Sequence, residues 1–103
     1  MKPPDCYLVL VCHKSLEHRL VDHLLAHPEW VSGFSVNTIE GHSQREYLPS
    51  MLEQVRGHSR RIEIGTALNR EDARALIAHL KSAEPNNEIA YWVMPILEFG
   101  RLA

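Results

Sequence analysis

The sequence predicts an α+β domain of the ferredoxin-like type, in the order β-α-β-β-α-β. Three observations predict it: an apolar run near each end of the chain, two stretches with helical apolar spacing, and a matched pair of alternating runs in the middle. We expect a four-stranded antiparallel sheet with both helices on one face. Because 103 residues support one two-layer core, the chain should form a single domain over residues 1–103.

The first and last strands are expected at Cys6–Cys12 and Glu88–Met94. Both runs are apolar on both faces, which is typical of strands that are buried on two sides. Two helices can cover only one face of the sheet, so the other face should carry an apolar patch that monomers rarely expose. Its expected members are Trp92, Met94 and either Leu8 or Tyr7. We therefore expect a homo-oligomer built through the open sheet face.

The two helices have recognisable ends. Ser15 is expected as the N-cap of the first, which stops before His27-Pro28, and Asn69 as the N-cap of the second, with Asp72 completing a capping-box-like start. Their apolar positions are Leu16, Leu20, Val21, Leu24 and Leu25 in the first helix, and Ala73, Leu76, Ile77 and Leu80 in the second.

The central runs, residues 33–42 and 58–68, are expected to pair as an antiparallel hairpin. Placing His42 opposite His58 sets apolar residues against apolar ones and an acid against a base. The resulting pairs are Glu40 with Arg60, Thr38 with Ile62, Val36 with Ile64 and Phe34 with Thr66. A slip by one residue would reverse the faces, whereas a slip by two would keep them and stays open.

The insert between these runs, residues 43–57, is long for a hairpin loop, where about two to five residues are usual. Tyr47 to Val55 suggest a helical turn that begins near Pro49-Ser50 and ends at Gly57. Long ordered loops tend to be functional. The insert either docks on a partner or packs Met51 and Leu52 on a neighbour.

Composition and motifs exclude several classes. The formal charge of −2 brings no basic excess, which argues against nucleic acid as a partner. The first apolar run is too short for a signal or a membrane span, so a cytoplasmic location is expected.

Cys6 and Cys12 lie roughly 20 Å apart in one strand and cannot form a bridge. With no GxSxG or phosphate loop, and no third group beside Cys12-His13, no enzyme activity is expected.

Strand direction brings one set of possible metal ligands together. The ends of the first and second strands and the start of the third share one edge of the sheet in this fold. Thiol and imidazole groups there are ligands suited to Zn or Cu. The candidates are Cys12, His13, His42 and His58. The alternative is an ordinary cross-strand polar pair of His42 and His58. His23 and His27, four residues apart on the first helix, form a second possible pair.

The runs FSVNTIEGHSQR, RIEIGTAL and YWVMPILEFGR resemble the second strand with the start of the T-loop, the third strand and the C-terminal segment of the PII signal-transduction proteins. The chain is more closely similar to bacterial PII-like proteins of unknown function, some of which are encoded beside heavy-metal efflux systems. The resemblance implies a trimer with effector clefts between subunits, and a T-loop-like insert at residues 43–57.

The resemblance also implies effector-binding residues. Gly41 matches the glycine before the T-loop, and Gln44 and Arg45 stand where the family has Arg-Gln near the nucleotide phosphates. Arg101 matches the first arginine of the C-terminal Arg-x-Arg pattern.

Several positions depart from that pattern. The Arg-Gln order is reversed, Ser43 replaces a glycine, and Ala103 replaces the second C-terminal arginine. The flexible glycine-and-lysine stretch that the family has before the last strand is replaced by SAEPNNE. Because phosphate clefts depend on fixed basic donors, these changes argue against binding of ATP or ADP.

The leading hypothesis is a non-enzymatic PII-like regulatory trimer that senses a small effector or metal ion at a subunit edge. It would act through residues 43–57 on a partner protein such as a transporter or metal-efflux system. The alternative is a metal-tolerance trimer of the CutA type that uses His13, His42 and His58. A structural module without a ligand is the third hypothesis.

Overall fold

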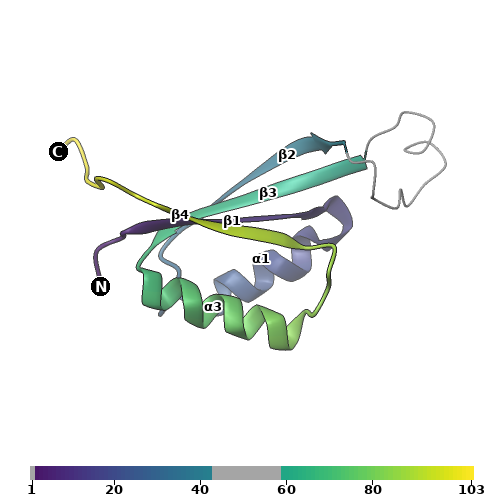
Figure 1. Ribbon diagram of the computed structural model, residues 1–103, viewed down its shortest axis with the longest axis horizontal. Coiled ribbons are helices and arrows are strands. Elements are labelled where there is room, and N and C mark those ends of the chain that lie inside the picture. The colour runs from purple at the N-terminus through teal and green to yellow at the C-terminus, as the bar shows by residue number, and fades with distance from the viewer. Residues whose placement is uncertain (1, 43–58) are drawn as a thin grey trace.

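A computed structural model describes residues 2–42 and 59–103 of the chain. Its sheet has four strands in the order β2-β3-β1-β4, and every neighbouring pair is antiparallel. Helices α1 and α3 lie side by side on one face of that sheet (Figure 1). The elements are β1 (Cys6–His13), the 3-10 turn η1 (Lys14–Leu16), α1 (Glu17–Leu25), β2 (Ser35–Gly41), β3 (Ser59–Leu68), α3 (Arg70–Ala83) and β4 (Ala90–Pro95). The ferredoxin-like prediction is confirmed, while the helical turn expected within 43–57 lies outside the described residues.

The central hairpin has the predicted register. Glu40 is opposite Arg60, Thr38 opposite Ile62 and Val36 opposite Ile64. The slip by two residues that the pattern left open does not occur. Ile62 and Ile64 are buried under the helices, so the apolar face of the hairpin is the one that packs on the core.

The core lies between the sheet and the two helices. Alternate residues of β1 and β3 point into it, as the period of two in a strand requires. Each helix adds its inward stripe. The core consists of Cys6, Leu8, Leu10, Cys12, Leu20, Leu24, Val31, Ile62, Ile64, Leu68, Ala73, Leu76 and Leu80. The one buried polar residue among the described ones, Thr66, donates a hydrogen bond of 2.7 Å to the carbonyl oxygen of Gly33.

The start of the first helix differs from the prediction. Ser15 is not the N-cap of α1, which is Leu16 and makes no side-chain capping bond. His13 instead caps the preceding 3-10 turn, because its Nδ1 accepts a hydrogen bond of 3.1 Å from the Ser15 backbone N–H. A single 3-10 turn follows, and α1 begins only at Glu17. Leu25 is 64% exposed, so it does not belong to the buried stripe. The cap of α3 is confirmed, since the Asn69 side chain accepts a 3.0 Å bond from the Glu71 N–H.

The open face of the sheet carries the predicted apolar patch. Met94 is opposite Tyr7 and Trp92 opposite Val9, whereas Leu8 is in the core. The choice between Leu8 and Tyr7 is thereby settled in favour of Tyr7. Trp92 and Met94 remain 43% and 42% exposed in a single chain.

The last strand begins two residues later than expected. The Ile89 N–H donates to the Asn86 carbonyl oxygen, and the Glu88 N–H donates to the Asn86 side chain, so a turn extends through residue 89. Beyond β4 the chain runs away from the body to the C-terminus, and Leu97 is fully exposed there (Figure 1).

Candidate functional site at the loop-bearing edge

The edge predicted to gather the metal candidates exists, but its residues are staggered. β1 and β2 end, and β3 begins, on the side where residues 43–58 connect (Figure 1). His13 is level with Arg61 on β3 and hence with Ile39 on β2. His42 lies three residues further on, which is roughly 10 Å along the strand at about 3.3 Å per residue, and two strand spacings away laterally. His13 and His42 are therefore too far apart to share one ion as the backbone stands.

The side chains of the other candidates do not converge either. His13 uses its Nδ1 in the helix cap, 2.9 Å from the Ser15 Oγ. Cys12 is fully buried in the core, and His58 lies outside the described residues. Within residues 2–42 and 59–103, no three His, Cys, Asp or Glu side chains are arranged around a common point.

Burial also changes the chemistry of Cys12. Removal from water raises the pKa of the Cys12 thiol to about 11, although the charge of Arg61 opposes the effect. Burial likewise raises the pKa of the Cys6 thiol. A metal ligand or nucleophile must be a thiolate, and at neutral pH both groups are protonated thiols.

This protonation and burial lead to a testable expectation for thiol reactivity. In the native protein at pH 7.5, Cys6 and Cys12 should react with DTNB about 100-fold more slowly than in urea, because buried structural thiols are inert. Release of thionitrobenzoate measures both rates. Rapid modification of one thiol per native chain would contradict the placement of Cys12 in the core.

Gly41, predicted to bind the effector, lies at the end of β2 beneath the side chain of Arg61. A Cβ atom built on Gly41 would lie 2.6 Å from the Arg61 Nε, closer than nonbonded atoms approach. The glycine therefore allows the arginine to cross the end of β2. Sequence reasoning placed Arg61 on the open face of the hairpin but assigned it no role at the base of the insert.

The other predicted effector residues lie apart from Gly41. Gln44 and Arg45 fall outside the described residues. Arg101 is in the exposed tail, and Figure 1 shows the C-terminus at the opposite end of the molecule from the edge that bears the insert. Gly41 and Arg101 consequently do not meet within one chain.

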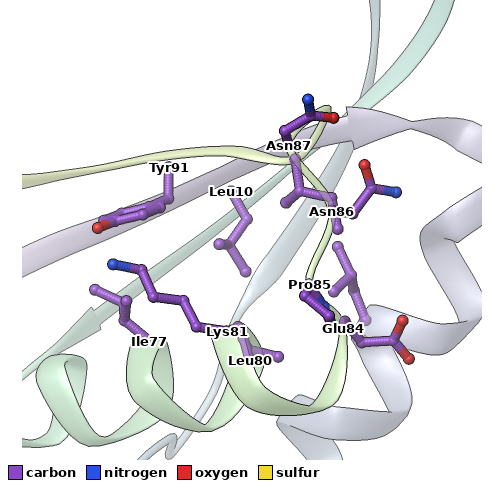
Figure 2. Close-up of a pocket in the computed structure, with 11 residues that line it drawn as sticks. Leu10, Ile77, Leu80, Lys81, Glu84, Pro85, Asn86, Asn87 and Tyr91 are labelled. Carbon is purple, nitrogen blue, oxygen red and sulfur yellow. The ribbon is translucent and has the colours of Figure 1, made fainter.

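A cavity of about 280 Å³ opens between α3, the turn after it and β4, a region that sequence reasoning treated only as a turn (Figure 2). Its interior is apolar, and its mouth carries amide and charged groups. The Lys81 Nζ lies 5.4 Å from the centre of the Tyr91 ring at one side of the opening. Small-molecule sites combine an apolar interior with a few polar groups in this way. The cavity is lined by Leu10, Leu20, Ile77, Leu80, Lys81, Glu84, Pro85, Asn86, Asn87, Ile89 and Tyr91.

A second cavity, of about 580 Å³, continues along the same side of α3 toward its N-terminus. Ile77 lines both cavities, so they form neighbouring parts of one depression between α3 and β4. Arg70 and Arg74 make the second cavity basic, while Asp5 accepts a 2.9 Å hydrogen bond from the Arg70 backbone N–H. No pattern in the sequence indicated this depression, because it depends on how far α3 lies from the edge strand.

The order β2-β3-β1-β4, with both helices on one face and a long insert between β2 and β3, defines a ferredoxin-like domain. A nitrogen regulatory PII-like protein, CPII from Thiomonas intermedia K12, solved with ADP, AMP and bicarbonate bound, matches with a TM-score of 0.71 at 17% identity. The match covers 97% of each chain. CutA1 from Pyrococcus horikoshii OT3 matches with a TM-score of 0.69 at 9% identity, over 92% of this chain and 86% of that one. At these identities the likeness shows the fold alone.

The chain belongs to the DUF3240 family of proteins of unknown function, whose family profile matches residues 3–103. A DUF3240 family protein from Shewanella baltica OS155 is 25% identical, with a TM-score of 0.75 over 99% of this chain and all of that chain. No curated protein matches the chain. The prediction of a family of unknown function is confirmed, and the fold is the one that PII-like proteins have. Among the described residues, no helix is both long enough and apolar enough to cross a membrane.

Proposed function

We propose that the protein is a non-enzymatic PII-like regulator that works as a homotrimer. In this proposal it binds a small effector between subunits and acts on a partner protein through residues 43–57. A transporter or metal-efflux system is the partner class to test first. One observation carries the proposal. The PII pattern assigns Gly41 and Arg101 to one effector site, but the end of β2 that bears Gly41 and the C-terminal tail that bears Arg101 lie at opposite ends of the folded molecule. The two residues can therefore meet only across a subunit boundary.

The unpaired apolar surface supports assembly. Trp92 and Met94 lie on the open face of the sheet, and Leu97 and Leu102 in the tail are fully exposed. Monomers rarely leave so much contiguous apolar surface in water. A closed ring of identical subunits buries the same patch on each subunit and leaves no copy unpaired.

The distribution of basic groups supports an anionic effector. Arg61 crosses Gly41 at the insert-bearing end, while Arg101 is carried on the tail at the other end. Guanidinium groups bind carboxylates and phosphates through paired N–H donors. CPII, which has a similar fold, was solved with ADP, AMP and bicarbonate. Such anions are therefore the first effectors to test here, even though the missing second arginine argues against ATP and ADP.

The test combines thermal unfolding with light scattering on metal-stripped protein. AMP, ADP, bicarbonate, Zn²⁺ and Cu²⁺ are added separately. A ligand at 100 times its Kd stabilises the native state by about 2.7 kcal/mol. We expect an anion to raise the Tm of a trimer, and Arg101→Ala to remove at least about half of the stabilisation, since charged hydrogen bonds contribute about 1.5–3 kcal/mol.

Lys2→Ala is the matched control, because Lys2 carries the same charge but pairs with Glu71 of its own chain at 2.6 Å. The stabilisation should survive in that variant. A monomer by light scattering, or an anion effect that Arg101→Ala leaves unchanged, would contradict the intersubunit site.

A metal-tolerance function of the CutA type is the second candidate. The observation that favours it is the shared edge at which β1 and β2 end, which carries His13 and His42 and leads to His58. In the same screen it predicts stabilisation by Zn²⁺ or Cu²⁺ that disappears in His42→Ala and His58→Ala. The stagger of His13 and the burial of Cys12 weigh against this candidate as the main function.

A further inference from the structure

Three histidines gather where the end of α1 meets α3. His23 lies on α1, His27 just after it, and His79 on α3. The His23 Nδ1 and the His79 Nε2 are 3.1 Å apart. The rings of His27 and His79 have centroids 4.4 Å apart, and the side chains of His23 and His27 are about one quarter exposed. The histidines are therefore closely packed yet within reach of solvent.

Carboxylates determine which nitrogen of two of these rings carries the proton. The Glu84 carboxylate accepts bonds from the Arg19 guanidinium at 2.6 and 3.2 Å and lies 3.2 Å from the His23 Nε2. An ionised carboxylate can only accept, so the His23 Nε2 carries a proton, and in the neutral imidazole the Nδ1 then has a lone pair. In the same way Glu29, 2.9 Å from the His27 Nδ1, holds the proton there.

The pKa values of these carboxyl groups agree with that assignment. Desolvation tends to raise the pKa of Glu84, but the hydrogen bond from His23 and the charge of Arg19 together lower it below its usual value. The hydrogen bond from His27 is the largest cause that lowers the pKa of Glu29. Both groups are ionised at neutral pH and act as acceptors.

We propose that the His23 Nδ1 and the His79 Nε2 form a binding site for a divalent late transition-metal ion, with Glu84 orienting His23 from behind. Two nitrogens that bind one tetrahedral ion at about 2.0–2.1 Å lie about 3.3 Å apart, close to the spacing in the structure. A carboxylate on the second ring nitrogen is the usual support of a metal-bound histidine.

Proton balance is simple in this site. Without metal, the His79 Nε2–H donates to the His23 Nδ1. When the ion binds, it replaces that proton between the two nitrogens, and His79 carries its proton on Nδ1 instead. No net proton is released and no co-reactant is needed.

The protein supplies two nitrogen ligands at this site, because no three donors converge among the residues that the structure describes. Water completes the coordination of the ion. The ring of His27 is stacked on that of Trp30, with 4.5 Å between the ring centroids, and it also packs against His79. This packing limits the rotation of the His79 ring. With imidazole ligands and open positions, affinity should follow the order Cu²⁺ above Ni²⁺ and Zn²⁺.

The test is a calorimetric titration of the metal-stripped full chain with Cu²⁺ at pH 7, with the nitrogen hyperfine pattern of the bound ion read by electron paramagnetic resonance. The expected result is one site per chain whose spectrum shows two nitrogens. His23→Gln and His79→Gln should each weaken that site by at least about 10-fold, and Glu84→Gln by about 10-fold to 100-fold.

His18→Gln is the matched control, since His18 is an exposed histidine on the same helix. It should leave the affinity unchanged, as should His42→Gln at the loop-bearing edge. Urea unfolding in the presence of a chelator shows that each variant is folded. Unchanged Cu²⁺ affinity in both His23→Gln and His79→Gln, or its loss in His18→Gln, would overturn the proposal. The outcome is separate from the Arg101 test, which concerns another site and another class of ligand.

Discussion

Trp92→Asp is expected to convert the proposed trimer into monomers at micromolar concentration. Trp92 lies on the open sheet face opposite Val9, where the proposed neighbours pack. A carboxylate buried at that contact would lose its hydration without gaining a partner, a cost of several kcal/mol for each subunit. Size-exclusion chromatography with light scattering measures the change in mass.

Tyr91→Asp provides the control on the same strand. Tyr91 is also 43% exposed, but it is opposite Leu10 and faces the helix side of the sheet. This variant should stay trimeric. If Trp92→Asp also remains a trimer, the subunits assemble through another surface and the proposed effector cleft loses its basis.

Leu76→Ala is expected to lower the free energy of unfolding by about 3 kcal/mol, within the usual range of about 2–5 for a buried leucine. Leu76 is fully buried at the centre of α3, where its removal leaves a cavity that close-packed neighbours cannot fill. Urea titration followed by circular dichroism measures the change. Because assembly contributes to stability, both proteins are compared at one chain concentration.

The matched control is Leu25→Ala, since Leu25 is 64% exposed on α1. An exposed leucine has little packing to lose, and alanine is the better helix former, so the expected change is within about 0.5 kcal/mol. A similar loss in both variants would mean that the helix layer packs differently from the arrangement in the structure.

Glu84 belongs both to the proposed metal site and to the cavity between α3 and β4, which no sequence pattern linked. Its carboxylate supports His23 in the proposed metal site, and its side chain also lines the cavity between α3 and β4 (Figure 2). The residue stands at the C-terminal end of α3, directly before the turn that leads into β4. An ion bound at His23 and His79 and a molecule in the cavity would therefore contact the same short segment of chain.

Sequence patterns were sufficient to predict a structural feature where the residues that decide it recur regularly along one strand or helix. The alternation of apolar and charged residues determined which face of β2 and β3 is buried, and the pairing of Glu40 with Arg60 favoured the register that the structure has. The cap at Asn69 followed from its place before an apolar stripe. By contrast, the prediction of Ser15 as a cap was wrong, since Ser15 lies within a 3-10 turn capped by His13 and the N-cap of α1 is Leu16.

The sequence by itself determined the order of the elements, the inward face of each hairpin strand and the apolar character of the open sheet face, because all three depend on residue periodicity within a strand or helix. Tertiary structure alone decided which side chains share a site. The stagger between strands separates His13 from His42, whereas helix packing brings His23 to within 3.1 Å of His79, which is 56 residues away in the chain. Distances between elements depend on how whole layers pack, and no spacing along the chain encodes them.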